Sequence, residues 1–227
     1  MYLSHKYKFL FLRTPKTASS SLSDFFIRNI DDPDAIYTEV EDSGLPGTLD
    51  ERIVSRYRPY AFYHFSLQQL IAEGVITEEQ AHNYYCFALL RNPIDRAKSF
   101  YYFYKKWRTP NKPASLREYK SWTNNGVFDN DANSGIIQTD LLKFKDKMYG
   151  TYWLYEDLHV RLPMFMANIG VEIKHELPRH KTDTRKTKKN EIQFDNAAKN
   201  DIINYFKADW EMYNNKCPYP KDIRTDR

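Results

Sequence analysis

One lysine and a cluster of hydroxyl side chains lie between an apolar run and a helical pattern near the start of the chain. The apolar run spans residues 7–12, and the loop after it holds Lys16. The other loop residues are Pro15, Thr17, Ala18, Ser19, Ser20 and Ser21. A loop from a buried strand into a helix brings backbone N–H groups and side-chain donors to the positive end of the helix dipole. We therefore expect a phosphate-like group to bind here, the alternative being a plain helix cap with a surface lysine.

A second polar motif follows the longest buried strand that the sequence predicts, residues 84–90. Arg91 comes directly after this strand, and Pro93 suits the first position of a helix. Ser99 then lies about two turns into that helix. The planar fork of donors on an arginine matches a phosphate group, and the serine can add a hydroxyl. The alternative is a structural arginine in an ion pair and an ordinary helix serine.

The two motifs together resemble those of sulfotransferases. The chain holds no G-x-x-x-x-G-K-S/T motif, which weakens an ordinary kinase interpretation. The segment P-K-T-A-S-S-S-L resembles the loop that binds the phosphosulfate of adenosine 3′-phosphate 5′-phosphosulfate (PAPS). The segment R-N-P-I-D-R-x-x-S-F-Y-Y-F resembles the part that binds the 3′-phosphate. The pair is most similar to the carbohydrate sulfotransferases of the heparan sulfate and uronyl 2-O-sulfotransferase group.

This resemblance implies a role for each candidate residue. Lys16 would stabilise the bridging oxygen as the 5′-phosphate leaves, and the loop hydroxyls, Thr17 and Ser20 above all, would hold that phosphate. Arg91 and Ser99 would bind the 3′-phosphate. His64 lies upstream of the second motif, where the family has its catalytic base, although a structural histidine at a strand end is the alternative. The product would be adenosine 3′,5′-bisphosphate (PAP), and no metal would be required.

A basic segment precedes the last predicted helix, within residues 174–193. In sulfotransferases a basic loop at this place folds over the nucleotide, so the resemblance implies nucleotide contacts for some of its residues. The candidates are Lys181, Arg185 and Lys186. A solvated charge run is the alternative.

The bulk composition fits one domain spanning residues 1–227. With 227 residues, 41% hydrophobic and 16% aromatic, the chain can bury one core. The apolar runs near Phe9, Phe62, Phe87 and Tyr152 predict a three-layer α/β/α fold with a central parallel sheet, which the resemblance identifies as the P-loop-like sulfotransferase fold. No apolar run is long enough to span a membrane and no signal-peptide pattern is present, so we expect a cytoplasmic protein without membrane insertion. Residues 216–227 form a polar tail.

Helix starts are predicted from local capping patterns. Pairs of residues three apart form capping boxes that begin helices at Thr48, Ser66 and Thr77. Asp195 caps a final helix whose apolar positions continue to Tyr213.

Three functional hypotheses follow. The first is a sulfotransferase that moves the sulfuryl group of PAPS to a hydroxyl acceptor, a carbohydrate or a small metabolite, by in-line transfer with a histidine base. The second is a nucleotide-dependent kinase with an atypical loop. The third is a non-catalytic nucleotide- or nucleic-acid-binding protein, which we rank last because no nucleic-acid fold signature is present and the net charge of +4 is modest. We therefore expect no nucleic-acid partner.

Overall fold

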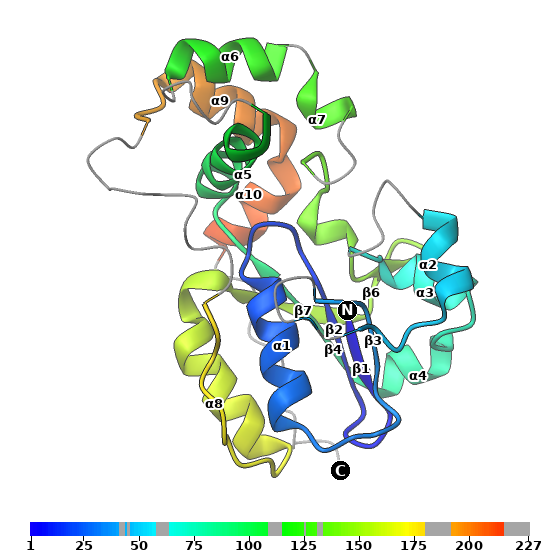
Figure 1. Ribbon diagram of the computed structural model, residues 1–227. Helices are drawn as coiled ribbons and strands as arrows, with labels where there is room; N and C mark the ends of the chain where they lie inside the picture. Colours follow the sequence, from blue (N-terminus) through cyan, green and yellow to red (C-terminus); the bar gives the residue numbers. More distant parts are fainter. Residues whose placement is uncertain are drawn as a thin grey trace.

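A mixed five-stranded sheet forms the centre of the computed structural model (Figure 1). The structure describes residues 1–40, 44, 46–57, 64–108, 115–124, 126–130, 134–179 and 192–215. The strands are β1 (Tyr2–Ser4), β2 (Phe9–Leu12), β3 (Ile36–Tyr37), β4 (Tyr85–Leu90) and β7 (Gly150–Leu154), in the order β3-β1-β2-β4-β7. A separate hairpin consists of β5 (Lys143–Phe144) and β6 (Lys147–Met148).

The sheet is parallel only in the part that carries the two motifs. Strands β2, β4 and β7 are parallel, with Leu10 opposite Cys86 and Cys86 opposite Gly150. The three-layer α/β/α fold and the parallel arrangement of the runs near Phe9, Phe87 and Tyr152 are confirmed. Strand β1, which was not predicted, extends this sheet and is antiparallel to both β2 and β3. The reason is length, because residues 5–8 are too few for the crossover that a parallel pair needs. The strand expected near Phe62 lies outside the described residues.

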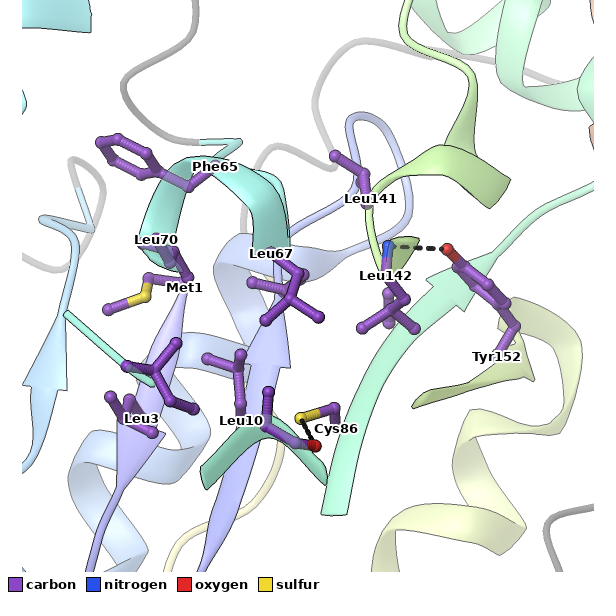
Figure 2. Packing of buried hydrophobic residues seen from close by; sticks show 14 of the residues in the cluster. Met1, Leu3, Leu10, Phe65, Leu67, Leu70, Cys86, Leu141, Leu142 and Tyr152 are labelled. Atoms are coloured by element: carbon purple, nitrogen blue, oxygen red, sulfur yellow. Dashed lines mark hydrogen bonds between the residues drawn. The ribbon is translucent and has the colours of Figure 1, made fainter. Parts of the chain in front are cut away.

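Helices cover both faces of the sheet. On one face, α1 (Ser19–Asn29) and α8 (Leu158–Asn168) pack against the aromatic residues of the strands, with the rings of Phe87 and Trp153 stacked at 4.1 Å. On the other face, α3 (Leu67–Ala72) and α4 (Glu78–Asn83) cover an aliphatic layer. Figure 2 shows this second layer, in which Leu67 and Leu142 lie over the strands. The central parallel strands β2 and β4 are buried on both faces, as expected for strands in the middle of a parallel sheet.

A second group of helices packs beyond the carboxyl ends of the parallel strands (Figure 1). It consists of α5 (Pro93–Arg108), α6 (Leu116–Asn124), α7 (Val127–Asn130), α9 (Asn196–Tyr205) and α10 (Lys207–Asn214). The single final helix expected after Asp195 is wrong, because the chain leaves helical geometry at Phe206 (φ −101°, ψ 39°) and continues as α10. Among the described residues, no helix is long and apolar enough to cross a membrane.

Two of the three predicted capping boxes are confirmed. Ser66 with Gln69 and Thr77 with Gln80 each make both reciprocal hydrogen bonds. The box at Thr48 is wrong, because the Thr48 hydroxyl accepts from the backbone N–H of Tyr37 and donates to another backbone carbonyl near β3. The helix α2 (Glu51–Tyr57) begins after Asp50 instead. Local capping therefore predicts a helix start well unless a neighbouring strand uses the same hydroxyl.

Candidate active site

The loop between β2 and α1 contains two residues in left-handed backbone conformation. Lys16 has φ 62° and Ala18 has φ 60°. Non-glycine residues adopt this conformation rarely and at a cost, and such strain concentrates at functional sites. Ala18 is the N-cap of α1 and has no side-chain oxygen with which to accept a hydrogen bond from the first helical turn. The N-terminal turn of α1 therefore presents backbone N–H groups to the loop, which suits an anion.

Several loop hydroxyls brace the loop from inside. Thr14 Oγ1 donates to the Leu89 carbonyl of β4 at 2.7 Å. Thr17 Oγ1 and Ser19 Oγ both donate to the Thr14 carbonyl, at 2.9 and 2.8 Å. Thr17 is fully buried in this arrangement. These bonds hold the loop against the end of β4 and restrict its conformation.

Lys16 lies against helix α5. Its Nζ atom is 4.1 Å from the ring centroid of Phe103 and 6.0 Å from that of Phe100, a cation–π arrangement. Ser99 precedes these two aromatic residues in sequence and is half-buried on the same stretch of α5. The predicted start of α5 at Pro93 is confirmed, with Asn92 Oδ1 accepting from the backbone of the first turn. The helix of the second motif therefore packs beside the lysine of the first.

Arg91 joins the two motifs directly. It follows the last residue of β4, and its Nη1 atom donates to the Lys16 carbonyl at 2.8 Å. Its guanidinium carbon lies 4.8 Å from the ring centroid of Tyr155, which follows β7. The carboxyl ends of β2, β4 and β7 thus bring together Lys16, Arg91 and Tyr155, as the general rule for α/β sheets predicts.

Arg13 adds a further positive charge that the sequence analysis did not single out. Its guanidinium is buried and donates through Nη2 to Ser20 Oγ at 2.8 Å, and through Nη1 to the Glu39 carbonyl at 2.9 Å. The available signal was its position, because an arginine at the carboxyl end of a buried strand is a candidate ligand residue. The loop is therefore surrounded by the cations of Arg13, Lys16 and Arg91, a donor set that fits an anionic ligand with phosphate groups.

His64 lies at the same edge of the sheet. Its Nδ1 atom is 2.9 Å from the Arg13 carbonyl oxygen. A carbonyl can only accept, so Nδ1 carries the proton, and in the neutral ring Nε2 is then the basic nitrogen. Main-chain anchoring of this kind fixes the ring and its tautomer, which a general base requires.

A cavity of about 550 Å³ opens beside His64. Its size falls in the range of small-molecule sites. The wall comes from α3 and from the segment 136–146, and it mixes amide, apolar and charged side chains: Ser66, Gln68, Gln69, Ile136, Ile137, Asp140, Leu141, Lys143 and Asp146. Two aspartates face one lysine, and Lys143 pairs with Asp140 at 2.6 Å.

Two other features of the described residues are less suited to chemistry. Cys86 is buried in β4, and burial raises its pKa to about 12, so the thiol stays protonated near neutral pH and is a poor nucleophile. In the described part of the chain, no three His, Cys, Asp or Glu side chains gather as a metal site would need. Three predicted nucleotide contacts, Lys181, Arg185 and Lys186, lie outside the described residues, as does the tail 216–227.

Comparison with known families agrees with the sequence motifs. The model of the sulfotransferase family matches residues 1–219. No curated protein matches. Among solved structures, the chain is similar to the crystal structure of a sulfotransferase from Alicyclobacillus acidocaldarius, with 16% identity and a TM-score of 0.44. That alignment covers 89% of this chain and 92% of the other.

Proposed function

Because the chain belongs to the sulfotransferase family, we propose that it transfers the sulfuryl group of PAPS to a hydroxyl acceptor. The observation that carries this proposal is the contact between Arg91 Nη1 and the Lys16 carbonyl, which joins the two motifs that we propose as phosphate sites at one edge of the sheet. When bound, PAPS supplies an activated sulfuryl group on its 5′-phosphate. The cations and backbone N–H groups around the loop match the two phosphates in charge and donor type.

Lys16 and the first turn of α1 would bind the 5′-phosphate end of the nucleotide. Negative charge builds on the bridging oxygen when the sulfuryl group leaves, and a fixed ammonium and helix N–H groups stabilise that charge. The loop hydroxyls of Thr17, Ser19, Ser20 and Ser21 remain candidates for this phosphate. Thr17 and Ser19 donate to a loop carbonyl in the structure, so their contact with phosphate would require these hydroxyls to rotate.

Arg91 would grip the 3′-phosphate, with Ser99 adding a hydroxyl from α5. The guanidinium is already held by the Lys16 carbonyl and by the face of Tyr155, so little side-chain freedom is lost when a phosphate binds. This part of the proposal explains why the enzyme would prefer a nucleotide with a 3′-phosphate to one without it.

His64 would act as the general base. Nδ1 is anchored on the Arg13 carbonyl, which leaves Nε2 as the nitrogen that takes the proton from the attacking hydroxyl. The cavity beside the ring would hold the acceptor. Its mixture of amide, hydroxyl and apolar side chains suits a carbohydrate or a similar polyhydroxyl compound, because such molecules have both polar edges and apolar faces.

The proposal is tested by calorimetric binding of PAP, with AMP and ATP as comparison ligands and no magnesium present. We expect PAP to bind the wild type more tightly than AMP does. Arg91→Ala should weaken PAP binding by about 10- to 100-fold, because a hydrogen bond to a charged group contributes about 1.5–3 kcal/mol. The exposed Arg117 on α6 gives the control variant Arg117→Ala, which should bind PAP as the wild type does. Equal binding of PAP and AMP, or binding of ATP only with magnesium, would contradict the proposal.

The charge of the cavity predicts which acceptors react. The wall has more carboxylates than ammonium groups, so it disfavours a polyanionic glycan. With PAPS as donor, PAP release should be faster with cellobiose than with a disaccharide that carries a uronic acid and a sulfate. A clear preference for the sulfated, acidic disaccharide would show that this cavity does not select the acceptor.

A further inference from the structure

Gln138 is a fully buried amide that holds the backbone of Arg91. It lies in the short helix η2 (Gln138–Asp140), and its Oε1 atom accepts from the Arg91 backbone N–H at 3.1 Å. Its Nε2 atom donates to the Arg91 carbonyl at 3.2 Å. Strand β4 ends at Leu90 and α5 begins at Pro93. Arg91 therefore lies between two elements. The Gln138 side chain supplies hydrogen-bond partners for the backbone N–H and carbonyl of Arg91.

Gln138 is itself fixed from the opposite side by α10. The carboxylate of Asp209 is fully buried and accepts from the Gln138 backbone N–H at 2.9 Å and from its Nε2 at 3.2 Å. The other carboxylate oxygen accepts from the backbone N–H of Thr139 at 2.9 Å. The same turn is held again by Arg96, whose Nη1 donates to the Ile136 carbonyl at 2.7 Å. The turn that carries Gln138 thus has one orientation, set by buried charged groups.

The effect on Arg91 is to fix the point from which its side chain starts. A long arginine side chain has many rotamers, and ordering it costs free energy whenever it binds a ligand. With both backbone groups held, the guanidinium is directed to the Lys16 carbonyl and the Tyr155 ring. Loss of the Gln138 amide would leave the backbone N–H and carbonyl of Arg91 without these partners. The Arg91 side chain would then no longer be held in one orientation.

We propose that Gln138, held by Asp209, is the positioning residue for Arg91 and thereby sets the preference of the enzyme for nucleotides with a 3′-phosphate. This inference rests on the proposed function, because it assumes that Arg91 binds that phosphate. It makes α10, which lies far from both motifs in the sequence, part of the nucleotide specificity. If Gln138 had only a structural role, its substitution would change stability without changing that preference.

The test is the ratio of PAP affinity to AMP affinity, measured by calorimetry for Gln138→Met. Methionine keeps the approximate length and removes both hydrogen-bonding groups. We expect PAP affinity to fall about 10-fold or more and AMP affinity to change less than about 3-fold, because AMP lacks the phosphate that Arg91 would bind. The control is Thr139→Val in the same turn, since Thr139 Oγ1 is buried and has no hydrogen-bond partner among the described residues. This control should leave the ratio unchanged.

The outcomes distinguish a failure of the proposed function from a failure of the positioning role. If the wild type itself shows no preference for PAP, the proposed function fails before the role of Gln138 is considered. If the wild type prefers PAP and Gln138→Met keeps the same ratio, the positioning role is overturned. In the Arg91→Ala background, Gln138→Met should cause no additional loss of the ratio, because the glutamine acts through that arginine.

Should Gln138→Met not fold, the ratio is measured for Gln138→Asn, which keeps the amide but shortens its reach. A lowered ratio then supports the positioning role, and an unchanged ratio overturns it.

Discussion

Backbone carbonyl groups connect Lys16 and His64 to the rest of the candidate site. Lys16 has a left-handed backbone and its carbonyl receives Arg91, so the residue that carries the ammonium also anchors the second motif. The His64 ring is held through Nδ1 by the carbonyl of Arg13, a residue of the same loop. A side-chain substitution at Lys16 would therefore remove the ammonium but keep the carbonyl that Arg91 binds. A substitution at His64 would remove the base and change the hydrogen bond to the Arg13 carbonyl.

Substitution of His64, the proposed general base, should affect the rate and not the binding of the nucleotide. His64→Gln should lower the rate of sulfuryl transfer by about 10²- to 10⁴-fold, the usual contribution of general-base catalysis, while leaving PAP affinity within about 3-fold. PAP release in the presence of acceptor measures the rate, and calorimetry measures the affinity. The matched control is His82→Gln, because His82 is exposed on α4. An unchanged rate for His64→Gln would assign the base to another group.

The elements that position the site form mainly from local sequence signals. The buried strand ending before Arg91, the helix opening at Pro93, and the capping boxes at Ser66 and Thr77 all follow from patterns within a few residues. The direction of β1 and the break at Phe206 do not, because each depends on what the segment packs against. The types of these elements and the parallel arrangement of β2, β4 and β7 were therefore predictable from the sequence, whereas the added strands β1 and β3 and the break between α9 and α10 were not.

The contact between β4 and β7 gives a prediction at the scale of elements. A Cβ atom added at Gly150 would lie 2.3 Å from the backbone oxygen of Cys86, its partner in β4. Gly150→Ala should therefore lower the free energy of unfolding by about 3 kcal/mol, since backbone cannot move aside as a side chain can. Urea denaturation measures the loss.

Gly74 provides a control, because it is a glycine that no other described part of the chain approaches closely. Gly74 has φ +71° with open space around it, and asparagine tolerates the left-handed region. Gly74→Asn should cost less than about 1 kcal/mol. Equal losses at both positions would mean that the close approach of β4 and β7 does not constrain the sheet.

On the scale of the whole molecule, two hydrophobic regions meet at a buried polar junction. One region is the sheet with α1, α3, α4 and α8, and the other is formed by α5, α6, α7 and α9 (Figure 1). Between them lie the fully buried side chains of Gln138 and Asp209 and the nearly fully buried Arg96. Burial lowers the pKa of Arg96 to about 10, so it remains charged at neutral pH beside Asp209, 3.7 Å away.

This junction predicts a large stability effect at one position. Asp209→Asn should destabilise the protein by about 3–5 kcal/mol, because it leaves a buried guanidinium without its counter-charge. Thermal and urea unfolding measure the change. Glu211→Gln on the same helix is the control, since Glu211 is exposed and its pair with Lys207 is long, 3.9 Å. That variant should change stability by less than about 0.5 kcal/mol. A small effect of Asp209→Asn would mean that the junction is not required to hold the two regions together.

The types of residue at the site and the local elements that carry them are encoded in short stretches of the sequence. A strand, a loop and a helix start each depend on neighbouring residues, so the lysine loop and the arginine motif were recognisable from the sequence. Which of these residues meet depends on the tertiary structure alone. Arg91 reaches the carbonyl of Lys16 across 75 positions, Gln138 holds Arg91 across 47, and Asp209 holds Gln138 across 71. Such contacts arise from strand order and helix packing, which no short stretch of sequence specifies.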